Sequence, residues 1–253
     1  MKIVFLIQRK QARGAELFAC DLAQELIRMG HEVRVWALFE GEFDLPYLGK
    51  IEVLSQQRSR SFFDFAAWRK LAKEILNFEP DIVQAMGGDT LKYLVFSKIL
   101  FSWESKSVFY NGSVISQYIN SSVVRRINQW FYTKVDAVVA VSTHSKIDFQ
   151  KIFKFNGVHS IIPVGVKTPL KQQKRPPLDS PVLVHVGGFS FEKNHVGLLR
   201  IFKKFLAKRP QAKLILIGDG PLTATIKQKV VSMGLSSQVD FKAVLSAPFE
   251  SIP

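Results

Sequence analysis

Apolar residues along this chain alternate between short continuous runs and a helical repeat. The first run, Lys2 to Ile7, predicts a buried strand, and apolar residues from Ala15 to Leu26 then recur with the 3.6-residue period of a helix. Gly30 follows that helix at the position where a helix C-terminus favours glycine. His31 to Leu38 predicts a second strand, so the opening segment has the pattern of two parallel strands joined by a right-handed helical crossover.

The same alternation continues through the first two thirds of the chain. Further short apolar runs predict strands at residues 51–54, 82–85, 107–110, 137–141 and 160–163. Helical repeats lie between them at residues 62–76, 90–101, 122–134 and 142–153. Strands that alternate with helices over this length predict a doubly wound parallel sheet of the α/β class.

A proline-rich segment then interrupts the pattern. Val166 to Pro181 contains four prolines, several cations and no periodicity, which is typical of a linker. The chain therefore divides into a first domain at residues 1–166, a linker at residues 167–181 and a second domain at residues 182–253. Because the 72 residues of the second domain are fewer than the ~100–150 of a typical domain, we expect it to be incomplete.

Two glycine-containing segments of the second domain each have a strand, then glycines, then a helix. They run from Val182 to Asn194 and from Leu214 to Leu222. In a parallel α/β sheet this order brings backbone N–H groups, and here Lys193, to the carboxyl ends of the strands, where ligands bind. Helix N-termini at that edge favour phosphate.

Composition and charge are those of a globular protein with an anionic partner. The chain has 253 residues, of which 47% are hydrophobic and 22% are charged, so it can form a sizeable core. The 35 lysines and arginines exceed the 21 acidic residues, giving a net charge of +14 that favours nucleic acid, phospholipid or phosphorylated ligands. The single cysteine, Cys20, excludes an internal disulfide framework, and no apolar run reaches the ~20 residues of a membrane span. We expect a cytoplasmic protein.

Seven short motifs follow one another along the chain. They lie at residues 14–16, 30–35, 79–83, 138–142, 161–166, 186–193 and 218–221. Residues 30–35 read Gly-His-Glu-Val-Arg-Val, and residues 218–221 read Gly-Asp-Gly-Pro. In this order they resemble the GT-B type glycosyltransferases of family 4, over essentially the whole chain. Arg13, Val164 and Gly188 replace the family's glycine, asparagine and arginine.

The resemblance implies a GT-B-like fold, in which two Rossmann-like doubly wound domains face each other across a cleft. In this family the carboxyl-terminal domain binds a nucleotide-diphosphate sugar and the amino-terminal domain binds the acceptor. The sugar passes to an acceptor hydroxyl with retention of configuration, and no metal or cofactor is bound. We therefore expect a glycosyltransferase whose acceptor is a cell-envelope glycan or a lipid-linked molecule.

Carried over residue by residue, the resemblance also predicts a donor-diphosphate site. Lys193 matches the family lysine whose charge offsets that of the leaving diphosphate, although a solvated lysine at a helix start is the alternative reading. Arginine can make two parallel hydrogen bonds to a phosphate, so the glycine at position 188 predicts weaker binding of the donor diphosphate. The other predicted site residues, for which simple tight turns are the alternative, are Gly14, Gly187, Gly218, Gly220 and Pro221.

The sequence gives little evidence for a catalytic, zinc-binding or nucleic-acid-binding site. No catalytic residue is predicted, because the paired glutamates of the family would lie beyond Pro253. One cysteine and the lack of a paired-histidine motif argue against a zinc site, and no nucleic-acid-binding module is recognisable.

Two stretches of the first domain mix aromatic residues with cations, Arg58 to Lys73 and Val123 to Lys134. Such a mixture suits the surface of an anionic membrane, where rings lie at headgroup level and cations meet the lipid phosphates. An ordinary amphipathic helix with a basic outer face is the alternative. The first interpretation predicts peripheral association with the inner face of the cell membrane.

Two other functions remain open. The chain could be a catalytically inactive fragment, or half of a two-chain enzyme, that retains only acceptor or membrane binding. Vesicle binding without sugar transfer would favour that reading. A nucleotide-sugar epimerase is the weaker alternative, and product analysis without an acceptor would identify it.

Overall fold

The computed structural model describes residues 1–55, 63–165 and 180–243. The chain forms two compact units, Met1–Val166 and Lys167–Pro253. The predicted linker at 167–181 lies outside the described residues apart from its last two positions, as does the beginning of the aromatic stretch Arg58 to Lys73. Among the described residues, none of the helices has the length and hydropathy that crossing a membrane requires.

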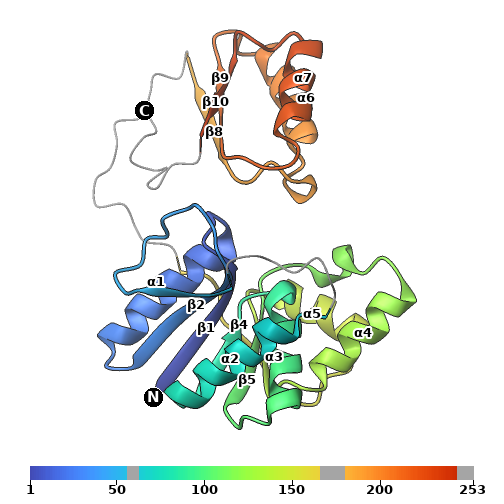
Figure 1. Cartoon of the computed structure of the whole chain (residues 1–253). Helices are drawn as coiled ribbons and strands as arrows, with labels where there is room; N and C mark the ends of the chain where they lie inside the picture. Colours follow the sequence, from blue (N-terminus) through green and yellow to red (C-terminus); the bar gives the residue numbers. More distant parts are fainter. Residues whose placement is uncertain (56–62, 166–179, 244–253) are drawn as a thin grey trace. The chain divides into compact units, whose positions relative to one another are not determined.

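Unit 1 is built on a seven-stranded sheet in which all neighbouring strands are parallel (Figure 1). The strand order is β3-β2-β1-β4-β5-β6-β7, which reverses direction between β1 and β4. That reversal is the topological switch point at which α/β sheets bind ligands. The strands are β1 (Lys2–Arg9), β2 (Glu32–Phe39), β3 (Ile51–Ser55), β4 (Ile82–Ala85), β5 (Lys106–Asn111), β6 (Ala137–Ala140) and β7 (Val158–Ile161).

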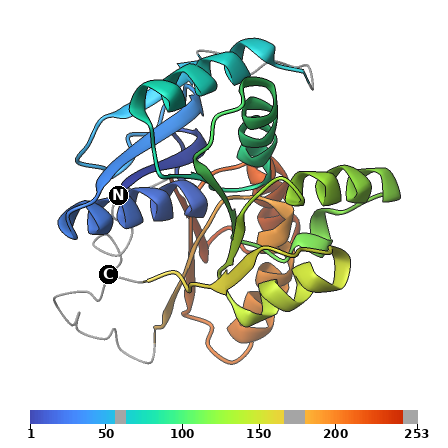
Figure 2. The same ribbon diagram turned by 90° about the horizontal axis from the view of Figure 1, so that it is seen from below.

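Helices cover both faces of this sheet, with α1 on one face and α2 and α3 on the other (Figure 2). Successive side chains of a strand point to opposite faces, so Phe5 and Ile7 pack in the core beneath α1, while Val4 and Leu6 pack in the other core. Burial on both faces explains why β1 is almost continuously apolar. The helices are α1 (Gly14–Arg28), α2 (Phe65–Phe78), α3 (Gly88–Phe101), the 3₁₀ turn η1 (Ile115–Tyr118), α4 (Ser122–Tyr132) and α5 (Thr143–Ile152).

The predicted end of the first helix is confirmed. Gly30 has a φ of +86°, and its amide donates to the Ile27 carbonyl while the His31 amide donates to Leu26. These are the two hydrogen bonds of a Schellman cap, which needs a residue that tolerates positive φ. The glycine therefore ends the helix and sends the chain into β2.

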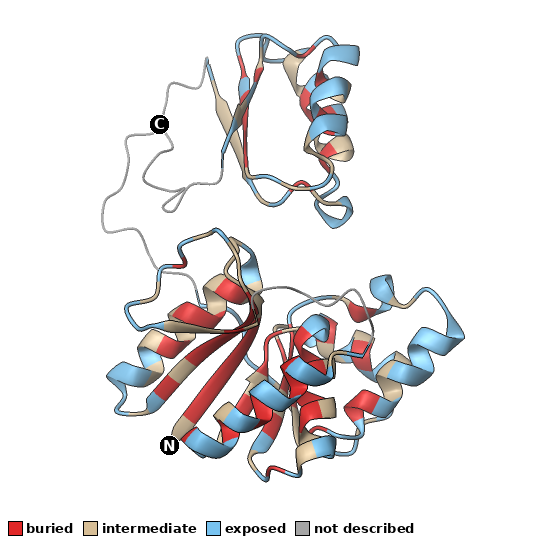
Figure 3. Cartoon of the chain, in the orientation of Figure 1, coloured by how far each residue is buried: buried red, intermediate tan, exposed pale blue. Residues whose placement is uncertain are grey.

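Unit 2 is smaller and repeats the same alternation. Its three parallel strands have the order β10-β9-β8, and in the described part of the unit both long helices lie on one face of the sheet (Figures 1 and 3). The core between them contains Phe202, Leu214, Leu216 and Ile226. The elements are β8 (Val182–Val186), η2 (Phe191–Lys193), α6 (His195–Leu206), β9 (Lys213–Ile217), α7 (Thr223–Ser232) and β10 (Val239–Lys242).

One carboxylate joins three elements of unit 1. Asp136, just before β6, accepts hydrogen bonds from the Ser107 amide and hydroxyl, both at 2.8 Å, and pairs with Lys98 at 3.2 Å and Lys106 at 3.4 Å. Burial alone would raise the pKa of this carboxyl, but the Ser107 hydrogen bonds and the Lys98 charge together hold it well below its usual range. The folded state therefore favours the ionised form.

We predict that Asp136→Asn lowers the free energy of unfolding by about 1–2 kcal/mol at pH 7, since hydrogen bonds to a partly exposed charge are lost. Because the folded pKa is depressed, the difference between wild type and variant should be present above pH ~4 and disappear as the pH falls further. Urea unfolding at several pH values measures it. Lys106→Gln is the control and should change little, because Lys106 is mostly exposed. If both variants lose the same free energy of unfolding, the hydrogen bonds and the Lys98 ion pair of Asp136 are not the stabilising interactions.

Candidate functional site

The two predicted glycine segments of unit 2 meet at the carboxyl edge of its sheet. Val186 of β8 lies level with Ile217 of β9, so the turns that follow the two strands begin side by side. The Gly187 amide donates to the Ile217 carbonyl at 2.9 Å, and the Phe189 amide donates to the Asp219 carbonyl at 3.0 Å. These hydrogen bonds join the two turns into one backbone platform.

Steric constraint separates the glycines of this platform into two kinds. Gly218 has a φ of +145°, and a Cβ there would overlap the carbonyl oxygen of Gly187. A Cβ at Gly220 would lie 2.7 Å from the Phe189 carbonyl oxygen. At Gly187 and Gly188, by contrast, the nearest atoms lie at ordinary van der Waals distances of 3.4 Å and 3.5 Å. The close approach of the turns therefore requires glycine at 218 and 220 but not at 187 and 188.

Backbone amides of the platform remain available for a ligand. The Gly220 amide is taken by the Asp219 carboxylate at 2.7 Å and by the Thr223 hydroxyl at 3.1 Å. In the part of the chain that the structure describes, the amides of Gly188 and Asp219 have no hydrogen-bond partner. Unpaired N–H groups beside a helix start are the usual binding groups for an anion.

Lys193 lies at the end of η2, where its side-chain stem passes the Gly187 turn. Its Cε is 3.5 Å from the position of a Cβ at Gly187, and the residue is exposed. No carboxylate pairs with it among the residues the structure describes. Asn194 follows in the left-handed region with a φ of +46°, and its side chain caps α6 through the Gly197 amide. This cap turns the chain so that Lys193 stays beside the platform.

Two histidines lie behind Lys193. His195 is only 1% exposed, stacks on Phe189 at a centroid distance of 4.4 Å and meets the His185 ring edge-on at 4.8 Å. Burial lowers the pKa of both imidazoles, and the Lys193 charge lowers it further. Both ring nitrogens of His195 and the Nε2 of His185 have no hydrogen-bond partner among the described residues. The pair is therefore a neutral packing support for the turn.

Sequence reasoning missed the position of these two histidines beneath the predicted diphosphate loop. The available signal was their spacing, since His185 comes two residues before Gly187 and His195 two residues after Lys193.

Gly14, the remaining predicted site residue, belongs to unit 1. It is the first residue of α1, directly beyond the loop that follows β1, and a Cβ there would meet no atom within 4 Å. The nearby Glu16 is buried and accepts a hydrogen bond from Gln11 Nε2 at 2.8 Å, and burial raises the pKa of its carboxyl. Gly14 and Glu16 thus lie at the switch point of unit 1.

Metal-binding and thiol chemistry have little basis in the described residues. No group of three or more histidine, cysteine, aspartate or glutamate side chains is placed there to hold a metal ion. Cys20 is buried in α1, and burial raises the pKa of its thiol to about 12. Cys20 is therefore a packing residue.

Comparison with solved structures defines the class of the fold. The HepE protein of Anabaena in complex with UDP-glucose matches with a TM-score of 0.75 over 97% of this chain and 69% of its own length, at 20% identity. WaaG, a glycosyltransferase involved in lipopolysaccharide biosynthesis, matches with a TM-score of 0.69 over 97% of this chain and 71% of its own, at 14% identity. The chain has the GT-B type of fold, with two Rossmann-like domains of which the second is smaller.

Family comparison then gives the membership. The model of Glycosyltransferase Family 4 matches residues 12–169, and that of Glycosyl transferases group 1 matches residues 166–248. The chain belongs to this glycosyltransferase family, as its motifs predicted. An uncharacterized glycosyltransferase of Methanocaldococcus jannaschii is 25% identical over 201 residues, or 72% of this chain and 50% of that protein. The chain thus spans about half the length of this curated relative.

We predict that Gly218→Ala destabilises unit 2 by about 2–4 kcal/mol, because the methyl group meets backbone and the positive φ is strained for alanine. Gly187→Ala is the matched control and should change stability by less than about 1 kcal/mol. Denaturant unfolding followed by circular dichroism compares the two variants. If the two variants are equally stable, the turns after β8 and β9 can move apart without a loss of free energy of unfolding, and the close contact at Gly218 is not required.

The lowered pKa values of His185 and His195 predict a pH-dependent stability. Because their folded pKa values are lowered below the ordinary 6.5, stability should be complete above that pH and fall as the unfolded imidazoles take up protons, by up to about 1.4 kcal/mol per pH unit for each histidine. His195→Phe keeps the stack on Phe189 and should flatten this dependence. Urea unfolding of both proteins between pH 7.5 and pH ~5.5 measures it, and unchanged slopes would contradict the account.

Proposed function

We propose that this chain is part of a glycosyltransferase that moves a sugar from a nucleotide-diphosphate sugar to a cell-envelope glycan or lipid-linked acceptor. The observation that supports it most is the platform of unit 2, where the amides of Gly188 and Asp219 and the cation of Lys193 lie together without a partner among the described residues. An array of this kind suits a diphosphate. The UDP-glucose bound by HepE supports the same class of donor.

The platform would act on the departing nucleoside diphosphate. As the bond between sugar and phosphate breaks, negative charge grows on the phosphate oxygens, and fixed N–H groups with a cation stabilise it without reorganisation. The neutral His185 and His195 would hold the Lys193 turn in place without repelling the lysine. Retention of configuration and independence of metal are proposed from the family pattern.

The acceptor would bind to unit 1 at or near a membrane. The side chains of Val123, Ile127 and Trp130 on α4 are 63%, 39% and 41% exposed, and the cations near them are Arg126 and Lys134, whose Nζ lies 5.9 Å from the centre of the Trp130 ring. Exposed apolar groups beside cations suit an anionic lipid surface. WaaG acts in lipopolysaccharide biosynthesis, which supports an envelope acceptor. We propose a location at the cytoplasmic face of the membrane.

Lys193→Gln tests the donor site. We predict that it weakens binding of UDP-glucose, used as the probe, by about 10- to 100-fold, as expected when a charge-assisted phosphate contact is lost. Lys213→Gln, at the opposite end of β9, is the matched control and should bind as the wild type does. Calorimetric titration of the full chain gives both affinities.

A second variant tests the departure from the family pattern. Gly188 is exposed and its position admits a Cβ, so Gly188→Arg should strengthen binding by supplying a bidentate phosphate contact. If neither substitution changes the affinity, the platform is not the donor site. Transfer that EDTA abolishes would contradict metal independence, and donor binding without any transfer would favour the half-enzyme alternative.

A further inference from the structure

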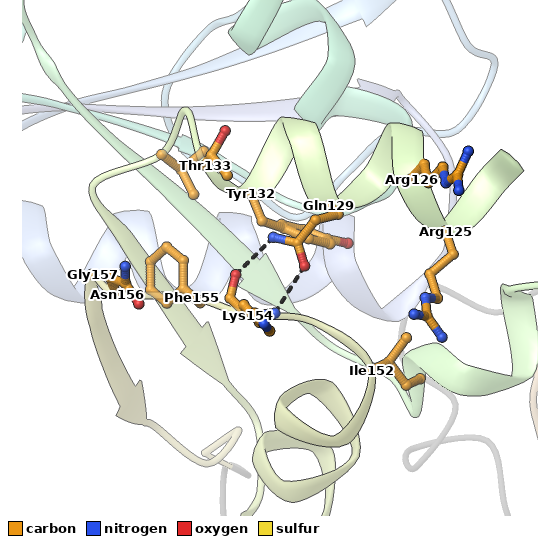
Figure 4. Close-up of a pocket in the computed structure, with 11 residues that line it drawn as sticks. Arg125, Arg126, Gln129, Tyr132, Thr133, Ile152, Lys154, Phe155, Asn156 and Gly157 are labelled. Carbon is orange, nitrogen blue, oxygen red and sulfur yellow. Dashed lines mark hydrogen bonds between the residues drawn. The ribbon is translucent and has the colours of Figure 1, made fainter. Parts of the chain in front are cut away.

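A cavity of about 600 Å³ opens in unit 1 between α4 and the segment that joins α5 to β7 (Figure 4). Gln129 fixes its wall, because its Nε2 donates to the Lys154 carbonyl at 2.8 Å while its Oε1 accepts from the Lys154 amide at 2.8 Å. The nitrogen and the oxygen of the Gln129 side-chain amide are both hydrogen-bonded, so this side chain is fixed in position at the cavity wall. The volume lies within the range of small-molecule sites.

This cavity is separate from the glycine turns of unit 1. Thr133 and Gly157, which line it, come shortly before β6 and β7 and so lie at the amino ends of these strands. Gly14 and Gly88 begin α1 and α3 at the opposite, carboxyl edge of the sheet. A ligand in the cavity would therefore occupy a second site, remote from the switch point.

The described residues that line the cavity include cations but no acidic residue. Arg125, Arg126 and Lys154 contribute three positive charges. None of them pairs with a carboxylate within the described ranges of the chain, whereas Lys98 and Lys106 share Asp136. Three unneutralised cations around one opening favour an anion, and arginine in particular favours the planar, bidentate recognition of phosphate.

A buried hydroxyl adds a second, independent indication. Tyr132 lines the cavity, is fully buried, and its ring is held by Phe149 and Phe153 at 4.7 Å and 4.8 Å. Its hydroxyl lies on the Arg125 side of Gln129 (Figure 4) and has no hydrogen-bond partner among the described residues. A buried donor without a partner is uncommon and calls for an explanation. Burial raises the pKa of this phenol, so it stays a neutral donor.

Helix geometry distinguishes the cavity from the apolar surface of α4. At about 100° per residue, Arg125, Gln129 and Tyr132 fall on one flank of the helix. Val123 and Ile127 fall on the other flank. The cationic cavity and the exposed apolar residues are therefore two different features of one helix.

We propose that this cavity binds a phosphate group, with Arg125, Lys154 and the Tyr132 hydroxyl as its main donors. The group could belong to a soluble phosphate ester or to a lipid headgroup, since the recognised chemistry is the same. The apolar surfaces of Val135 and Phe155 at the cavity would contact the part of the ligand next to the phosphate. This site does not depend on donor binding in unit 2.

The test is a titration of the full chain carrying Lys193→Gln, which removes the other predicted phosphate-binding cation. Inorganic phosphate and glycerol 3-phosphate are the soluble probes, and phosphatidylcholine vesicles with and without phosphatidic acid are the lipid probe. We expect saturable binding in at least one arm, weakened at least about tenfold by Arg125→Gln and by Lys154→Gln. Lys151→Gln, an equal loss of charge outside the cavity, should change binding by less than about twofold.

Two further variants separate binding from folding. Tyr132→Phe removes only the orphan hydroxyl, so it should weaken binding several-fold without lowering the melting temperature. Arg125→Lys keeps the charge and should restore part of the affinity. If no probe binds saturably, or if Lys151→Gln weakens binding as much as Arg125→Gln does, the cavity is not a phosphate site. The arm in which the variants act identifies the source of the phosphate.

Discussion

The register of β8 on β9 is the constraint on which the candidate donor site depends. Because Val186 lies level with Ile217, the turns that follow the two strands begin side by side and are in close contact. The space between them admits backbone but no side chain at Gly218, and the turns respond by bonding to each other through their own amides and carbonyls. What is left over after this mutual pairing, the amides of Gly188 and Asp219, is the part of the platform that a ligand can use.

The support beneath the platform is aromatic and uncharged. The Phe189 ring of the turn stacks on the His195 ring, and the ring of His185, from β8, contacts His195 edge-on. Neutral imidazoles place no second positive charge beside Lys193, so they do not repel its ammonium group. The cavity of unit 1 differs, because its lining includes three cations, and Gln129 holds the backbone of Lys154 at its edge by two hydrogen bonds.

Much of the fold could be predicted from the sequence, because the period of apolar residues is a local property. The strands, the main helices and the helix end at Gly30 were all predicted, and the family with its GT-B fold followed from the order of the motifs. The roles of the donor-site residues remain predictions. The histidine stack and the surroundings of the Tyr132 hydroxyl could not be predicted, since they depend on how side chains pack in three dimensions and not on the period of apolar residues. The cavity forms where side chains of α4 meet the segment at residues 152–157, and two hydrogen bonds from Gln129 hold Lys154 there.

The strand order of unit 1 also has a consequence for synthesis of the chain on the ribosome. β2 adds to β1 and β3 adds to β2 on one side, and β4, β5, β6 and β7 then add one after another on the other side. Each strand therefore meets an edge that already exists when it emerges, and no strand has to be inserted between two others. Domains generally fold as units with the amino-terminal one first, and in unit 1 the order of translation is also an order in which the sheet can grow.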